Sequence, residues 1–181
     1  MEIIMNQIFM KERKIFPLVL SMALPMMLSM AFSSLYNIVD SYFVAKLSED
    51  AMTALSLVFP AQNLMTSVAV GFGVGINAMI AFYLGAGQQK RADKAATQGL
   101  MFSVLHGFLI MALCLIGMPA FLGTFTSRQS VVDLGVEYSN IVFLFAVIVN
   151  VGITYEKIFQ SVGRMKETMI CMVIGFVANI A

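Results

Sequence analysis

Long stretches without a charged residue alternate with short charged segments along the whole chain. A helix needs about 20 mostly apolar residues to cross the hydrocarbon layer of a bilayer, and four of the five stretches have about this length or more. The stretches are Ile15–Val39, Ala51–Gln89, Ala95–Ser127, Tyr138–Tyr155 and Thr168–Ala181. The pattern predicts an all-α, polytopic bundle of transmembrane helices at about 15–46, 54–84, 95–122, 136–158 and 168–181.

The fifth stretch is shorter than a bilayer-spanning helix. At 1.5 Å per residue, Thr168–Ala181 would extend only about 21 Å, against about 30 Å of hydrocarbon. We therefore expect the chain to be the amino-terminal part of a longer protein, to end within its fifth helix, and to be inactive alone.

The overall composition excludes most other classes of protein. Apolar residues make up 60% of the chain and charged residues only 12%, whereas soluble domains carry about 25% charged residues. The first apolar run is too long for the core of a secretory signal. A membrane β-barrel would instead show segments of about ten residues with alternating hydrophobicity.

Basic residues are concentrated on one side of the predicted bundle. Only Lys46 and Arg128 lie in loops of the opposite side. The other nine are Lys11, Arg13, Lys14, Lys90, Arg91, Lys94, Lys157, Arg164 and Lys166. The positive-inside rule places residues 1–14 and the 85–94 and 157–167 loops in the cytoplasm. The net charge of +1 argues against a nucleic-acid partner.

Asp40 is the one acidic residue with apolar helix on both sides. A carboxylate at the bilayer centre costs about 2.5–3.5 kcal/mol on insertion scales, so such residues usually face a cavity and bind or relay ions. Asn37 at i−3 and Tyr36 at i−4 can face the same cavity. The alternative is an interfacial Asp near the outer mouth, because Asp40 lies late in its helix.

Other features of the apolar runs are candidates for a conformational or binding role. Pro25 predicts a kink in the first helix, about four turns before Asp40. Gly71 and Gly75 form a small-xxx-small pair that favours close approach of another helix. Amide side chains within the runs suggest a polar interior, with Gln62 and Asn150 as cavity-lining candidates; the full set is Gln62, Asn63, Asn77, Asn140, Asn150, Gln160 and Asn179.

The sequence contains no arrangement typical of an enzyme active site or a metal centre. The two cysteines lie inside apolar runs without metal-ligand spacing, and the single histidine has no partners in the sequence pattern. The sequence has no Ser/His/Asp set, no cluster of His, Cys and Glu ligands and no phosphate-binding loop. We therefore expect a protein that is not an enzyme and has no cofactor or metal, apart from Na⁺ as one candidate ion at Asp40.

Several short motifs, in this order and spacing, resemble the multidrug and toxic compound extrusion (MATE) family, and the chain looks closest to its bacterial DinF-like and MepA-like branch. The matching elements are Pro25, Tyr36–Asp40 with Phe43-Val44, Pro60, Gly73-Val74-Gly75, Leu84–Gly87 before a basic loop, Phe159–Arg164 and Gly175–Asn179. Two departures are Ala45-Lys46, where the family often has Gly, and Gln160, where an Arg is frequent.

The resemblance implies twelve helices in two lobes, of which residues 15–181 would be an incomplete amino-terminal lobe lacking a carboxy-terminal partner lobe. It implies export of amphipathic, often cationic compounds across the bacterial cytoplasmic membrane, driven by inward flow of H⁺ or Na⁺. Asp40 matches the residue that binds the coupling ion, and Asn179 matches an amide of the same pocket. A flippase for lipid-linked saccharides and a non-transporting membrane scaffold or channel subunit remain alternatives.

Overall fold

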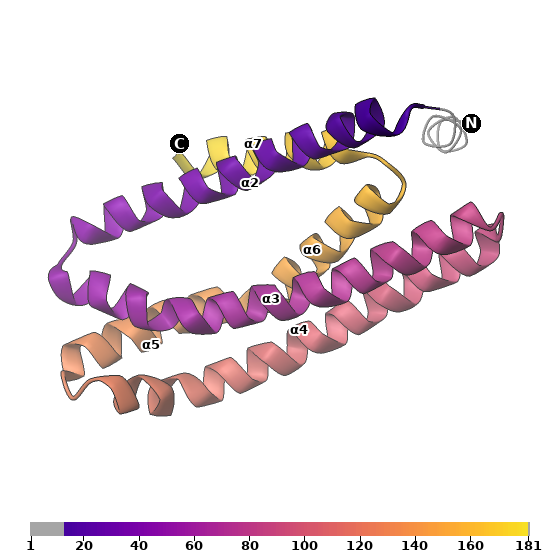
Figure 1. The fold of residues 1–181 in the computed structure, drawn as a ribbon. Helices are drawn as coiled ribbons and strands as arrows, with labels where there is room; N and C mark the ends of the chain where they lie inside the picture. The colour runs from indigo at the N-terminus through magenta and orange to yellow at the C-terminus, as the bar shows by residue number, and fades with distance from the viewer. Residues whose placement is uncertain (1–12, 181) are drawn as a thin grey trace.

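The computed structural model describes residues 13–180 of the chain, with side chains up to residue 178. The described part is helical, in accordance with the predicted all-α fold (Figure 1). The helices are α2 (Ile15–Ala45), α3 (Glu49–Gly85), α4 (Gln89–Phe125), α5 (Gln129–Leu144), α6 (Ala146–Ser161) and α7 (Met165–Ile180). Of the predicted cytoplasmic segment 1–14, residues 1–12 lie outside the described residues.

Three helices, α2, α3 and α4, are long and apolar enough to cross a membrane. The pair α5 and α6 passes the same test together, although the chain bends by 48° between them. Together these make up to four spans by length and composition.

The structure divides the predicted helix 136–158 into two helices. α5 ends at Leu144, Phe145 interrupts the helical hydrogen-bonding pattern, and α6 begins at Ala146. No proline marks this break, and the interrupting residue is itself apolar, so the hydrophobic pattern continues through it. The bend instead accompanies different packing partners, because α5 lies against α3 and α4 while α6 also contacts α7.

Charged residues extend two helices beyond the expected limits. α3 begins at Glu49 rather than 54, because the Ser48 hydroxyl accepts a hydrogen bond from the Ala51 amide at 3.0 Å and two acidic residues occupy the first turn. α4 begins at Gln89 rather than 95, so the basic residues between α3 and α4 lie in helix rather than in a loop. The turn between them contains Gly87 at φ +71°, a backbone conformation that favours glycine.

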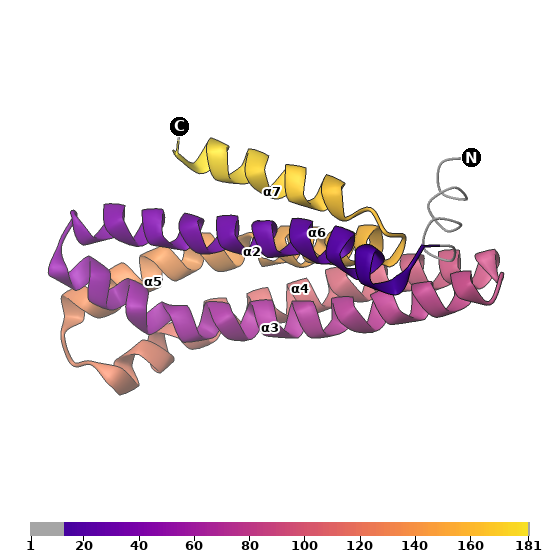
Figure 2. The same ribbon diagram turned by 45° about the horizontal axis from the view of Figure 1, so that its top comes forward.

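The helices form two groups. α3, α4, α5 and α6 pack against one another, whereas α2 packs mainly against α7 and touches α3 to a smaller extent. Figures 1 and 2 show α7 beside α2, and the rings of Phe32 and Phe176 meet at 5.5 Å between centroids. The buried apolar cluster lies entirely in the larger group: Val58, Met65, Met118, Leu122, Phe143 and Ala146.

Most large apolar side chains face outward. Phe16 is 78% exposed and Ile116 is 80% exposed, which would be unfavourable in water but is favourable against lipid tails. On the side where α2 joins α3, Asp50 of α3 accepts hydrogen bonds from Arg128 and from the Ser130 hydroxyl, and so holds the start of α5 against α3.

Candidate functional site

Asp40 lies near the end of α2 and is half-buried. It is the only charged residue of α2. Nearby polar groups satisfy the helix's own backbone: Asn37 Nδ2 donates to the Ser33 carbonyl at 3.0 Å, and Ser41 Oγ donates to the Asn37 carbonyl at 2.8 Å. The carboxylate therefore lies on a helix whose other side chains offer no opposite charge to it.

A hollow of about 400 Å³ lies between α2 and α7, one turn from Asp40. Tyr36 borders it together with Phe32 and Ser33 of α2, and α7 supplies Met172 and Phe176. Asn37 does not border this hollow and is exposed. The structure therefore directs Tyr36, but not Asn37, into a shared space between these two helices.

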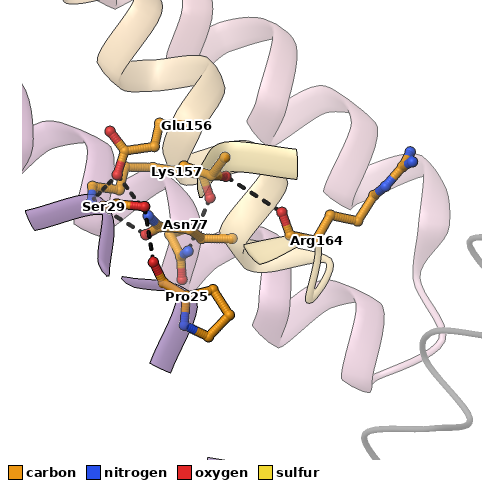
Figure 3. Close-up of polar contacts among 8 residues, drawn as sticks. Pro25, Ser29, Asn77, Glu156, Lys157 and Arg164 are labelled. Carbon is orange, nitrogen blue, oxygen red and sulfur yellow. Dashed lines mark hydrogen bonds and ion pairs between the residues drawn. The ribbon is translucent and has the colours of Figure 1, made fainter. Parts of the chain in front are cut away.

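Pro25 lies inside α2, which continues as α-helix on both sides of it. Pro25 and Ser29 are the buried residues of this helix, and Ser29 Oγ donates to the Pro25 carbonyl at 2.9 Å (Figure 3). The proline thus lies where α2 is packed, and Asp40 lies where α2 is more open.

The predicted cavity amides do not converge on Asp40. Gln62 Nε2 donates to the Tyr138 hydroxyl at 3.3 Å, which connects α3 to α5. Asn150 is 2% exposed and its Nδ2 donates to the Ala146 carbonyl of its own helix at 2.8 Å. The side chain of Asn179 lies outside the described residues. Gln62 therefore connects two helices of the α3–α6 group, whereas this hydrogen bond of Asn150 lies within α6.

A polar cluster that the sequence pattern did not predict lies at the end of α6 (Figure 3). Lys157 Nζ contacts Glu156 Oε1 at 3.1 Å and donates to Gln160 Oε1 at 3.2 Å, while Gln160 Nε2 donates to Glu156 Oε1 at 2.7 Å. Asn77 of α3 donates to the Lys157 carbonyl at 2.9 Å. The three side chains and Asn77 form a hydrogen-bonded connection between α6 and α3.

This cluster corrects one assignment from the sequence. Lys157 is not a loop cation, because α6 continues to Ser161 and the Lys157 side chain is only 12% exposed. The spacing of Glu156 and Gln160 at i and i+4 was the available signal. Arg164 and Lys166 keep this side of the bundle basic without Lys157.

The glycines of α3 also differ from expectation. A side chain at Gly71 or Gly75 would meet nothing within 4 Å, so these two do not mediate close helix approach here. Gly73 does: a Cβ there would lie 2.7 Å from Lys157 Cγ. The position between the expected pair therefore lets Lys157 lie against α3.

Residues 13–180 contain no group of three or more His, Cys, Asp or Glu side chains that could hold a metal ion. Cys114 and Cys171 are unpaired thiols on different helices.

Comparison with known proteins places the chain among transporters. The family model described as MatE matches residues 25–181. The multidrug export protein MepA of Staphylococcus aureus (strain NCTC 8325 / PS 47) is 23% identical over 173 residues, covering 95% of this chain and 38% of that protein. The FAD transporter of Shewanella oneidensis is 28% identical over 105 residues, covering 58% of this chain and 21% of that protein.

Solved structures show the same arrangement of helices. An outward-facing multidrug resistance MATE family transporter of the MOP superfamily matches with a TM-score of 0.84 and 27% identity, covering 88% of this chain and 35% of that one. A MOP superfamily transporter from Pyrococcus furiosus, described as having a binding pocket of reverse polarity that suggests a different function, matches with a TM-score of 0.83, 27% identity and the same coverage. The chain thus spans little more than a third of the length of these relatives.

Proposed function

The chain belongs to the MATE family of multidrug efflux transporters, and from this membership we propose that its helices form part of an antiporter that exports amphipathic, often cationic compounds. Inward flow of H⁺ or Na⁺ drives this export. The transporter resides in the bacterial cytoplasmic membrane with its amino terminus in the cytoplasm, as the excess of basic residues on that side favours.

The observation that carries the proposal is the half-buried carboxylate of Asp40 on an otherwise uncharged helix. A carboxylate on an apolar helix in a membrane is costly in its charged form, so residues of this kind commonly bind or relay ions. The hollow between α2 and α7, bordered by Tyr36 one turn away, supplies space beside it.

Binding at Asp40 is coupled to transport through α2. Fifteen residues separate Asp40 from Pro25, about 22 Å along the helix axis. Pro25 has no amide hydrogen to bond the preceding turn, so bending there is easier than elsewhere in α2. Neutralisation of Asp40 changes how the outer half of α2 packs on α7. A bend at Pro25 transmits this change to the site of the exported compound, and the transporter thereby alternates between its inward-open and outward-open states.

The test is ion-driven efflux of a fluorescent cationic dye by the whole transporter, as the cell makes it, in everted membrane vesicles. An imposed pH gradient and an imposed Na⁺ gradient are applied separately, which identifies the coupling ion. We expect Asp40→Asn to abolish the gradient-dependent efflux while the amount of protein in the membrane stays unchanged.

Glu49→Gln is the matched control, because Glu49 is an exposed carboxylate in the first turn of the next helix. Its removal changes the same charge without altering α2, so efflux should continue. If the Asp40→Asn variant exports the dye at the wild-type rate under both gradients, the proposed role of Asp40 is excluded. Absence of efflux by the wild type under either gradient, across a panel of dyes, would exclude antiport itself.

A further inference from the structure

A second hollow, of about 730 Å³, lies between α3 and α4 towards the turn that joins them. Its walls are largely apolar and include Phe72 and Met79 of α3 and Phe102 of α4. Each of these three side chains is 48% exposed. This hollow is separate from the α2–α7 space and contributes nothing to the transport mechanism proposed above.

The α3–α4 hollow has the length of one membrane leaflet. From Gly71 to Tyr83 along α3, twelve residues apart, the helix rises about 18 Å. Half of a hydrocarbon layer of about 30 Å is about 15 Å. An extended chain lying in this hollow would therefore reach from the membrane surface to about the middle of the bilayer.

Two basic side chains lie at the end of the hollow nearest the α3–α4 turn. Arg91 and Lys94 border it on α4, and the Arg91 guanidinium lies 5.9 Å from the centre of the Tyr83 ring. Asp93, between them in sequence, accepts a hydrogen bond from Gln89 Nε2 at 2.8 Å. Within residues 13–180, neither Arg91 nor Lys94 forms an ion pair, so both charges are open to an external anion.

Two glycines keep the apolar part of the hollow open. Gly71 and Gly75 both border it, and a Cβ built at either position meets no other atom within 4 Å. Their side of α3 is therefore free for something outside the described chain.

We propose that the α3–α4 hollow binds an anionic phospholipid of the cytoplasmic leaflet. Its phosphate contacts Arg91 and Lys94, and one acyl chain lies along Gly71, Gly75 and Phe102. Anionic headgroups bind basic pockets between helices on the cytoplasmic side of membranes, and the apolar walls match an acyl chain. The proposal rests on the orientation given under the proposed function, but not on ion coupling or drug export.

The experiment measures retained lipid on the whole transporter by native mass spectrometry, after purification in micelles that contain equal amounts of phosphatidylglycerol and phosphatidylcholine. We expect the wild type to retain phosphatidylglycerol preferentially. Arg91→Gln and Lys94→Gln should each weaken this retention about fivefold, the effect of removing one basic residue near an anionic lipid surface.

Two further variants separate the hollow from general surface charge. Lys90 lies in the same turn of α4 but does not border the hollow. The Lys90→Gln variant should therefore retain lipid as the wild type does. Gly75→Leu places a side chain in the hollow at a position where a Cβ meets nothing within 4 Å. It leaves both cations in place, and it should lose retention. Gly117→Leu is the control for Gly75→Leu, because Gly117 lies on α4 away from the hollow and a Cβ there also meets nothing within 4 Å.

Three results would overturn the proposal. One is equal retention of the two lipids by the wild type. Another is undiminished retention by Gly75→Leu, which would mean that the charges act only at the membrane surface. The third is a cysteine at position 75 that cross-links to another helix of the transporter, which would identify the hollow as a protein interface. Each readout is independent of transport, so a failure of the proposed antiport leaves it unaffected.

Discussion

Gly107 of α4 lies against the backbone of α6 at Val147. A Cβ at this position would lie 2.7 Å from Val147 Cα and 3.3 Å from Val147 Cβ. Real Cβ atoms do not approach so closely, and the nearest obstacle is backbone rather than the end of a flexible side chain. Gly107→Ala must therefore move α4 and α6 apart along this contact.

The expected magnitude follows from comparison with Gly117 on the same helix, where a Cβ meets nothing within 4 Å. Both Gly→Ala changes gain helix propensity, worth up to about 1 kcal/mol. Only Gly107→Ala adds an overpacking term of about 1–3 kcal/mol. The free energy of unfolding of Gly107→Ala should thus fall about 1–3 kcal/mol below that of Gly117→Ala.

The assay is unfolding of the whole transporter in mixed micelles of increasing SDS content, followed by circular dichroism. Because the two variants share the same chemical change and the same helix, their difference isolates the contact with Val147. Equal unfolding free energies would refute the reasoning and would mean that α4 and α6 separate without cost at this point.

Two other predictions concern charged groups at the ends of α6 and α7. Glu156→Ala should lower the free energy of unfolding by up to about 3 kcal/mol, because the mostly buried Lys157 ammonium loses its carboxylate partner. Unfolding in SDS should show that adding Lys157→Met recovers part of this loss. If the effects of the two substitutions on the free energy of unfolding simply add, the pairing is contradicted. Partial desolvation raises the pKa of Glu167, but the hydrogen bond and charge of Arg164 outweigh it and hold that pKa below its ordinary value of 4.5. The resulting stabilisation of the first turn of α7 is present above pH 4.5 and is lost as the pH falls through the lowered value; NMR titration of the Glu167 carboxyl should show a lowered midpoint that returns towards normal in Arg164→Gln.

The helices were predictable from sequence because lipid imposes a simple requirement. A spanning segment must be long, apolar and hydrogen-bonded within itself, so the uncharged runs alone locate α2, α3 and α4. Their ends were less predictable, because absence of charge marks where lipid ends rather than where helix ends. Ser48 and Gly87 were better signals, as a cap and a turn glycine.

Features set by contacts between helices could not be obtained from the sequence. The break at Phe145 lies in an apolar run and depends on the packing of α5 and α6 against different neighbours. The same holds for Lys157, whose burial depends on Gly73 of another helix. Asp40, in contrast, was identifiable because one carboxylate among apolar residues is informative without knowledge of its neighbours. Its role in ion binding, like that of Asn179, remains a prediction.

The packing of α2 differs from that of the α3–α6 group. Within the α3–α6 group, four glycines permit close packing, because a Cβ would clash at Gly73, Gly99, Gly107 and Gly135; α2 contains no glycine. The described part of α2 has only Pro25 and Ser29 as buried residues. Interdigitated helices resist displacement because movement opens voids or creates overlaps. A helix with so few buried residues can rearrange at lower cost, so the proposed neutralisation of Asp40 would act on a helix that is loosely packed in this part of the chain.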